Sequence, residues 1–213
     1  MTVLEDLGRA AVTLDLRSVL FGSVLAACSS SPPANNSVSG TNAFTVVTSV
    51  MRTRGDHCPS GVLASGKLDT LAVYMADGDA CSLPYLSPEN GLSHTLELQI
   101  ATGGFFAADR NAANQPLVAG TTFPILNEHV DDEDLCYNVP DGRTEPAGIV
   151  MFQVCSEGTC AEHSVIHWAT SGSITLSSVS ATSATGTFDL ALADNDGEPG
   201  GTLSGSFNSD ACP

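Results

Sequence analysis

Basic residues are scarce in this sequence. Lysine and arginine together number 7 against 24 aspartate and glutamate residues, so the chain of 213 residues carries a formal net charge of −17 at pH 7. Binding to nucleic acid depends on basic side chains that neutralise phosphates, and this balance therefore excludes nucleic acid as a partner. Anionic headgroups are repelled in the same way, whereas cations and basic proteins or polymers are compatible with the charge. The simplest consequence of so many carboxylates is a soluble surface.

Aromatic residues and catalytic motifs are also scarce. Phe, Tyr and Trp make up 6% of the chain, with one tryptophan and three tyrosines, so few rings are available for sugar stacking. The chain contains no G-x-S-x-G, no H-E-x-x-H, no P-loop and no G-x-G-x-x-G sequence, the patterns that position a nucleophile, a zinc ion or a phosphate. Acidic residues could supply the carboxylate pair of a glycosidase, but no two of them stand out. The sequence therefore predicts a protein that is not an enzyme.

The apolar run near the N-terminus is too short to cross a membrane. The ten residues Ser18–Ala27 carry no charge, and as a helix they would span roughly 15 Å, about half of a bilayer core. This length is typical of the apolar part of a secretory signal peptide. The region before it is acidic rather than basic, which suggests that translation starts downstream of Met1. The alternative is that residues 1–27 form an amphipathic helix of a cytosolic protein.

The run ends in the sequence Leu25-Ala26-Ala27-Cys28. It resembles the lipobox of bacterial lipoproteins, in which an aliphatic residue and two small residues precede an acylated cysteine. The resemblance implies that residues 1–27 are a lipoprotein signal peptide and that cleavage makes Cys28, with its diacylglycerol and palmitate chains, the first residue. Ser29 resembles the residue that directs such proteins to the outer membrane. We therefore expect an exported, outer-membrane-anchored lipoprotein that faces the periplasm or the cell surface.

Residues 28–42 are rich in Ser, Pro and Asn and show no core-forming pattern. Such a composition cannot bury enough apolar surface to become ordered, so we predict a flexible tether. Removal of residues 1–27 leaves 21 acidic and 5 basic side chains in 186 residues, enough for one domain with a real core. We place this single domain at residues 43–213.

Besides Cys28 the chain holds six cysteines, and an even number in an exported chain predicts three disulfides. Two links are predicted among the many pairings: Cys155 with Cys160, because the residues between them can turn, and Cys212 with an early strand. The candidates are Cys58, Cys81, Cys136, Cys155, Cys160 and Cys212.

Period-two alternation of apolar and polar residues predicts an all-β domain. In Leu92–Ala101 it places Leu96, Leu98 and Ile100 in the core and Thr95, Glu97 and Gln99 in water. Similar runs occur at Phe44–Arg52, Leu68–Met75, Val150–Val154, Ile174–Leu176, Phe188–Leu192 and Leu203–Phe207, and Trp168 is expected in the core beside Ile166.

Turn residues separate these runs. Short strands at this spacing predict an antiparallel β-sandwich, or a partly open barrel, of eight to ten strands that is stapled by disulfides. Residues 102–147 are the least regular part and are expected to hold the longest loops. A helical period is absent.

The C-terminal part carries a second resemblance. Ser171–Leu176, Gly186–Leu190 with its Gly-Thr-Phe, Leu203–Phe207 with its Gly-Ser-Phe, and Cys212 resemble the tail of predicted lipoproteins of myxobacteria that have not been characterised. The resemblance implies a β-meander closed by a cysteine, and it implies no activity.

Three stretches of the sequence contain several residues whose side chains commonly bind metal ions. Cys155, Cys160, His163 and His167 have the residue types of a zinc site. Exported cysteines pair with each other, however, and if Ser164–Trp168 is a strand the two histidines lie about 13 Å apart, too far to share an ion. A helical segment would restore the site, but we do not expect zinc.

The acidic stretch at residues 128–134 could hold calcium through Asp131, Asp132, Glu133 and Asp134, although a solvated loop explains it as well. The stretch Asp194–Glu198 resembles part of an EF-hand loop, but leucines stand at both terminal ligand positions, so we predict a hairpin turn.

These features together predict a lipid-anchored, non-enzymatic binding or structural module. The alternatives are a hydrolase of envelope or extracellular polymers and a calcium-dependent adhesion module.

Overall fold

The computed structural model describes residues 36–52, 68–81, 92–102, 115–126, 147–155, 164–194 and 196–212. Within these ranges the chain is all-β and forms nine strands, which agrees with the predicted fold class and number. They are β1 (Ser37–Gly40), β2 (Thr48–Arg52), β3 (Thr70–Ala76), β4 (His94–Ala101), β5 (Thr122–Pro124), β6 (Ala147–Cys155), β7 (Ser164–Val179), β8 (Ser183–Asp194) and β9 (Pro199–Ala211). No helix that is long and apolar enough to span a membrane occurs in this described part.

The strands form one mixed sheet whose hydrogen bonding closes into a ring. Around the ring, β2, β3, β4, β6, β7, β8 and β9 follow one another as antiparallel neighbours. Between β9 and β2 the pairing is parallel and short, with Val50 opposite Asp210 and Met51 opposite Ala211. Seven strands cannot alternate in direction all the way round a ring, so one parallel contact is required. The predicted antiparallel pairing therefore holds for every neighbouring pair of strands in the ring except this seam.

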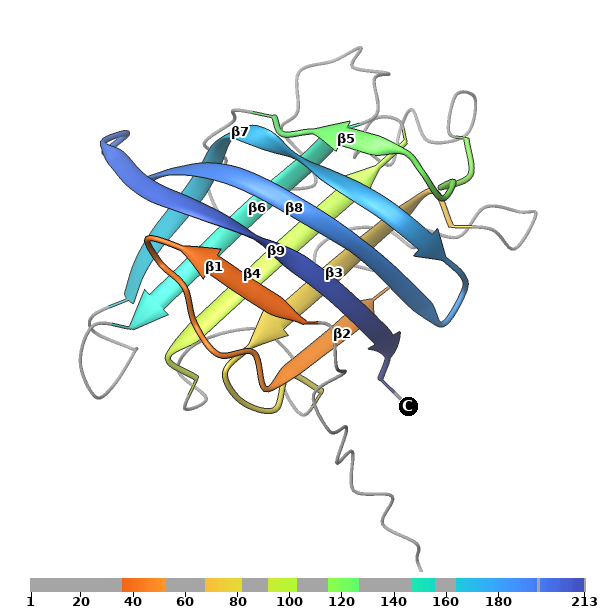
Figure 1. The fold of residues 1–213 in the computed structure, drawn as a ribbon, viewed down its shortest axis with the longest axis horizontal. Helices are drawn as coiled ribbons and strands as arrows, with labels where there is room; N and C mark the ends of the chain where they lie inside the picture. Colours follow the sequence, from red (N-terminus) through yellow and green to blue (C-terminus); the bar gives the residue numbers. More distant parts are fainter. Residues whose placement is uncertain are drawn as a thin grey trace, which may run out of the picture.

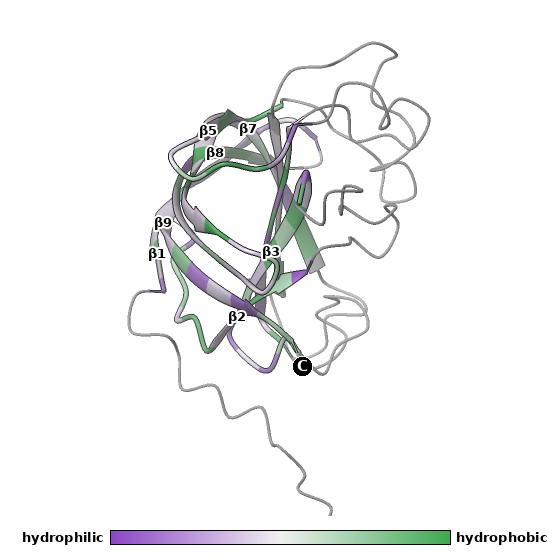
Figure 2. Cartoon of the chain, turned by 90° about the vertical axis from the view of Figure 1, so that its right-hand side faces the viewer, coloured by the Kyte–Doolittle hydropathy of each residue, from purple (hydrophilic) through white to green (hydrophobic). Residues whose placement is uncertain are grey.

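The ring is flattened into two layers (Figures 1 and 2). We call β2, β3, β4 and β6 the back layer, and β1, β5, β7, β8 and β9 the front layer. Strand β7 is counted with the front layer, but it also joins the two layers. Its first residues pair with β6 of the back layer, and its later residues pair with β8 and β5. The strands of the two layers cross at a steep angle in Figure 1, the arrangement of orthogonal sheet packing.

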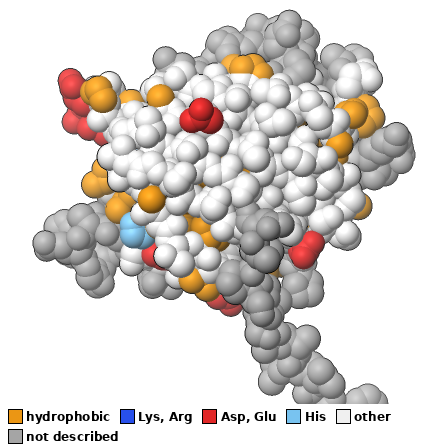
Figure 3. Space-filling view, viewed as in Figure 1, with side chains coloured by type: hydrophobic (Ala, Val, Ile, Leu, Met, Phe, Trp, Pro, Cys, Tyr) orange, Lys and Arg blue, Asp and Glu red, His pale blue; other side chains and the backbone are white. Residues whose placement is uncertain are grey.

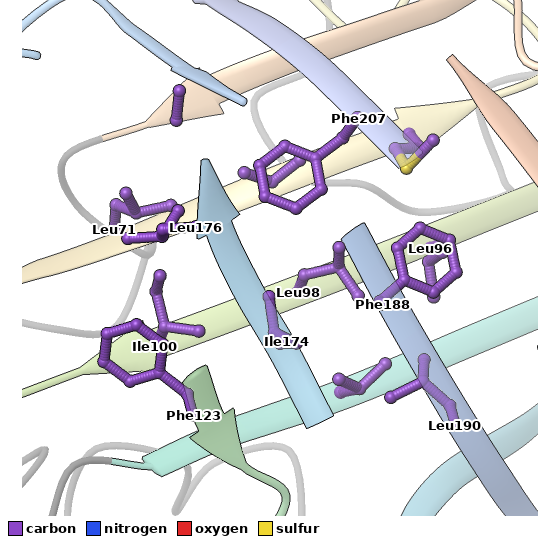
Figure 4. Packing of buried hydrophobic residues seen from close by; sticks show 14 of the residues in the cluster. Leu71, Leu96, Leu98, Ile100, Phe123, Ile174, Leu176, Phe188, Leu190 and Phe207 are labelled. Atoms are coloured by element: carbon purple, nitrogen blue, oxygen red, sulfur yellow. The ribbon is translucent and has the colours of Figure 1, made fainter. Parts of the chain in front are cut away.

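The core lies between the two layers. Phe123, Ile174 and Phe188 of the front layer are buried against apolar side chains of the back layer, including Leu98 and Ile100 (Figure 4). Each such side chain stabilises the fold by roughly 1.5–3 kcal/mol when it is removed from water. The inward residues of β4, β6, β7, β8 and β9 are those that the alternation predicted. Trp168 is buried as predicted, and the tail forms the expected meander.

The Gly-Thr-Phe and Gly-Ser-Phe sequences of the tail pair with each other across β8 and β9. Gly186 lies opposite Phe207 and Phe188 lies opposite Gly205. A Cβ atom on Gly186 would lie 2.5 Å from the Phe207 ring, and one on Gly205 would lie 2.8 Å from the Phe188 ring. Each glycine therefore leaves space for the phenylalanine of the other tripeptide, which explains why the sequence repeats the pattern.

One predicted boundary is wrong. Strand β1 lies inside the range 28–42 that was predicted to be a tether, so strand structure begins before the predicted start of the domain at residue 43. Strand β5 lies inside the range 102–147, which was expected to be the least regular part of the domain and to hold the longest loops. Both strands are short. Strand β1 is polar, whereas β5 contributes one buried residue, Phe123, to the core. They pair with β9 and β7, respectively.

A disulfide joins Cys81, which follows β3, to Cys212 at the end of the chain. This confirms that Cys212 ties the C-terminus back to an early part of the sheet. The link lies next to the seam between β2 and β9 and encloses a sequence separation of 131 residues. The predicted link between Cys155 and Cys160 lies outside the described residues, because Cys160 and the side chain of Cys155 are not described; Cys58 and Cys136 also lie outside them.

Candidate functional site

The outer side of the front layer is covered with hydroxyl groups. Its outward residues alternate with the buried residues of the same strands and are exposed or half-buried. We call this surface the hydroxyl face. It consists of Ser37, Ser39, Thr122, Ser171, Ser173, Thr175, Ser178, Thr185, Thr187, Thr202, Ser204 and Ser206.

The strand register arranges these hydroxyls in rows. One row crosses five strands in the order Thr122, Thr175, Thr187, Ser206 and Ser37. At its two ends the Oγ1 atoms of Thr122 and Thr175 lie 2.9 Å apart, and the Oγ atoms of Ser37 and Ser206 lie 3.0 Å apart. Neighbouring positions in a row are separated by about 4.8 Å, the spacing between strands.

Further rows lie on either side of the first. Ser173, Asp189, Ser204 and Ser39 form the next row, and the Oγ atoms of Ser39 and Ser204 lie 3.0 Å apart. On the opposite side, the Ser178 and Thr185 hydroxyls lie 2.7 Å apart. Because alternate residues of a strand repeat at about 6.7 Å, the rows form a two-dimensional array.

The hydroxyl face is nearly free of charge. Asp189 lies within the array and Asp210 at its margin, and the outward residues of the described front-layer strands include no lysine, arginine or aromatic residue on this surface. Figure 3 shows the same side of the molecule, with few acidic or hydrophobic side chains over the strands of this layer. The chain has a net charge of −17, so this surface carries much less charge than the composition of the whole chain would suggest.

The outer side of the back layer is different, because its polar side chains are buried. Thr95, Glu97 and Gln99 are only 3%, 8% and 7% exposed. The prediction that these three residues face water is therefore wrong. Alternation assigns side chains to two faces of a strand, but it does not determine whether the second face is also covered.

Glu97 is the centre of a polar cluster on this outer side. Its Oε1 atom accepts a hydrogen bond of 2.5 Å from the Gln99 amide. Tyr74 lies opposite Glu97 on β3, and the guanidinium of Arg52 lies 5.1 Å from the centre of the Tyr74 ring. Sequence reasoning missed this cluster; the signal available was a glutamate and a glutamine that alternate with leucine and isoleucine inside one strand.

The polar cluster does not have the composition of a glycosidase centre. Hydrolysis of that kind uses two carboxyl groups within roughly 5–10 Å of each other. Among the described residues on the outer side of the back layer, Glu97 is the one carboxylate. The described part of this side therefore offers a buried polar network but no carboxylate pair.

Four rings from four different segments of the chain stack on one another. Phe44 stacks on His94 at 5.4 Å and on Phe152 at 5.9 Å, and Phe152 stacks on His167 at 6.1 Å. His94 Nδ1 lies 2.9 Å from the Asp77 carboxylate. Asp77 also accepts the backbone N–H of Ser93, so this carboxylate holds the start of β4.

The fold perturbs the pKa of His167. Burial lowers its pKa below the ordinary value of 6.5, and the nearby Asp194 carboxylate partly opposes that shift. Its Nδ1 atom is buried without a hydrogen-bond partner, and a Cβ atom on Gly200 would lie 2.6 Å from it. Gly200 thus packs closely on the imidazole, and a larger residue at this position would clash with Nδ1.

A cavity of about 430 Å³ lies between the segment 116–119 and the turn that joins β7 to β8. This volume lies within the usual range for small-molecule sites. Its lining is mostly apolar and consists of Leu68, Pro116, Leu117, Val118, Ala119, Val179, Ser180 and Ala181.

The structure tests some of the predicted metal and lipid sites. Ser164–Trp168 belongs to β7, so the helix that would have restored a zinc site is absent from this segment. Asp194, Asp196 and Glu198 lie in the predicted hairpin turn between β8 and β9, in which the Asp194 carboxylate accepts the backbone N–H groups of Asp196 and Glu198. Cys28, His163, Asp131, Asp132, Glu133 and Asp134 lie outside the described residues. Within those residues, no three His, Cys, Asp or Glu side chains gather closely enough to hold a metal ion.

Comparisons with protein-family models, with curated proteins and with solved structures found no match for this chain. Any functional conclusion therefore rests on the residues and the geometry described above.

Proposed function

We propose that the protein is a lipid-anchored, non-enzymatic binding module of the cell envelope that contacts its ligand through the hydroxyl face. The observation that carries this proposal is the array itself: rows of exposed Ser and Thr that cross five strands with little charge. The rigid sheet beneath the array holds these hydroxyls in register, and a fixed arrangement reduces the entropy lost on binding.

The anchor part of the proposal rests on the lipobox-like sequence that ends at Cys28. Ser37, the first residue of β1, follows Cys28 by nine positions. Nine residues span at most about 32 Å, so a lipid on Cys28 would keep the domain close to the membrane. The anchor and the start of the sheet are thus compatible with a domain displayed at the membrane surface.

The alternative functions have less support. A hydrolase needs a reactive pair, and the described part of the back layer holds one carboxylate on its outer side. Calcium-dependent adhesion depends on residues 131–134, which lie outside the described residues. Both alternatives remain predictions from the sequence, and no observed contact favours either.

Mass spectrometry of the membrane fraction tests the anchor. We expect an N-terminal peptide that begins at an acylated Cys28, and we expect the Cys28→Ala variant to leave the membrane fraction. Ser30→Ala is the matched control and should stay with the membrane. A soluble wild-type protein with an intact Met1 would contradict the proposal.

Binding to isolated cell envelopes tests the second part. The full-length protein should sediment with envelope polymers after detergent removes the lipids, and heat-unfolded protein should not. Absence of binding to envelopes and to extracellular polymers, in a protein whose circular dichroism shows a folded β-domain, would contradict a binding role.

A further inference from the structure

From the hydroxyl face we infer the ligand class: a neutral polysaccharide that lies across the rows of serine and threonine. This inference rests on the proposed function, because it names the partner of the same surface. Three properties of the face support it, namely the type of hydrogen-bonding group, the charge and the periodic spacing.

The groups on the face are both donors and acceptors. When the Thr122 and Thr175 hydroxyls bond to each other at 2.9 Å, one of them donates, while the other keeps its own O–H and both keep lone pairs. The Ser178–Thr185 pair at 2.7 Å has the same property. Sugar hydroxyls also donate and accept, so they complement such pairs. Phosphates and carboxylates only accept, and ammonium groups only donate.

The charge of the face points to the same class. The described outward residues include no basic side chain that could hold an anionic polymer, and the net charge of −17 repels one. A cationic polymer would bind better to other parts of this acidic chain, because the hydroxyl face has only two carboxylates among its described residues, Asp189 and Asp210. Binding at this face is therefore favoured neither for an anionic nor for a cationic ligand, whereas a neutral ligand meets no electrostatic penalty there.

The spacing favours a polymer over a single sugar. Hydroxyls repeat at about 4.8 Å across the strands and about 6.7 Å along them, and each exposed hydrogen bond contributes little because water competes for it. The face has no aromatic side chain on which one sugar ring could stack. Useful affinity therefore requires many weak contacts with one long chain, as in other multivalent interactions.

The test measures retention of the full-length protein on insoluble neutral polysaccharides: cellulose, curdlan and starch. Chitosan and polygalacturonate serve as cationic and anionic comparisons. We expect retention on at least one neutral polymer that changes less than twofold between low and high salt. Short soluble oligosaccharides at millimolar concentration should not compete, because they cannot span the rows.

A triple variant, Thr122→Val, Thr175→Val and Thr187→Val, removes three hydroxyls of one row while it keeps the β-branched shape. We expect roughly a tenfold or larger loss of affinity for the polymer, since three hydrogen bonds disappear. Thr182→Val, on the exposed turn between β7 and β8, is the matched control and should bind like the wild type. Circular dichroism and thermal melting verify that both variants are folded.

Three results separate the possible failures. Retention on chitosan or polygalacturonate alone, with loss in the triple variant, would refute the neutral ligand and leave the binding face intact. Retention on a neutral polymer that the folded triple variant matches would refute the hydroxyl face as the site. Absence of retention on every polymer and on isolated envelopes would refute the proposed function as well.

Discussion

Strand β8 of the front layer and strand β4 of the back layer both carry polar residues at alternate outward positions, yet these residues differ in exposure. On β8 of the front layer, Thr187 and Asp189 are exposed beside buried Phe188 and Leu190. On β4 of the back layer, Glu97 and Gln99 are buried, as are Leu96 and Leu98 beside them. The same local pattern therefore produces a solvent-facing surface in one layer and a second buried surface in the other. The difference separates a face available to a ligand from a polar network that belongs to the interior.

The inward side of the front layer should show the largest effect. Phe188→Ala removes a buried ring that fills the space over Gly205, and such truncations cost about 3–5 kcal/mol. Thr187→Ala on the neighbouring outward position should change stability by no more than about 0.5 kcal/mol. Urea denaturation of both variants measures the contrast. Equal losses would show that the outward side of β8 is packed as well.

The seam between the two layers should show the next largest effect. Strands β2 and β9 share two register pairs there, and Cys81–Cys212 links the chain beside them. Loss of a bridge that closes so long a loop costs on the order of 3–5 kcal/mol.

The double variant Cys81→Ser/Cys212→Ser should therefore unfold at lower urea concentration, and its amides in β2 and late β9 should exchange faster. The ladder between β8 and β9 provides the internal control, because its register extends from Ser183 to Ala193. Uniform acceleration of exchange in all strands would contradict a local role of the disulfide at the seam.

The outer side of the back layer provides the direct test of the comparison. Gln99→Ala removes the donor to the buried Glu97 carboxylate, and loss of a buried hydrogen bond costs about 1–3 kcal/mol. Asp189→Ala in the front layer removes a carboxylate that is exposed, so its effect should be within about 0.5 kcal/mol. The melting temperatures of both variants, compared with that of the wild type, measure this difference in stability. A Gln99→Ala variant as stable as Asp189→Ala would show that Glu97 is hydrated in solution.

The smallest effect concerns His167 on β7, the strand that the two layers share. Because burial lowers its pKa below 6.5 in the folded protein, the unfolded chain takes up this proton first as the pH falls. The contribution of His167 to stability is therefore complete above pH 6.5 and decreases between that value and its lower folded pKa.

Urea midpoints at several pH values measure this dependence. In the His167→Phe variant, the loss of stability at falling pH that is due to His167 should disappear. The His94→Phe variant should still show this loss. If the urea midpoint of the wild type did not change between neutral pH and a pH well below 6.5, where His167 of the unfolded chain takes up its proton, the burial of the imidazole would be contradicted.

Much of the fold could be predicted because strand patterns are local. Leu96, Ile174, Phe188 and Leu203 were assigned to the core from alternation, and all four are buried. The turn at Asp194 was recognised from its residue types. Strands β1 and β5 were missed, since they are too short to show an alternating pattern and become strands through pairing with residues far away in the sequence.

The candidate site was less predictable than the fold. Serine and threonine occur throughout the chain, and nothing local indicates that Thr122, Thr175 and Ser37 lie in one row. Their row depends on the register between strands that are more than fifty residues apart in two of its steps. The burial of Glu97 also could not be predicted, because alternation reports two sides of a strand and not what packs against each of them.

By itself, the sequence determined the all-β class, the inward residues of most strands and the turn at Asp194, because these depend on neighbouring side chains and on local backbone preference. Closure of the ring at β2 and β9, alignment of the hydroxyl rows and burial of the second side of the back layer were decided by the tertiary structure. Each of these depends on contacts between distant segments, whose geometry no local pattern contains.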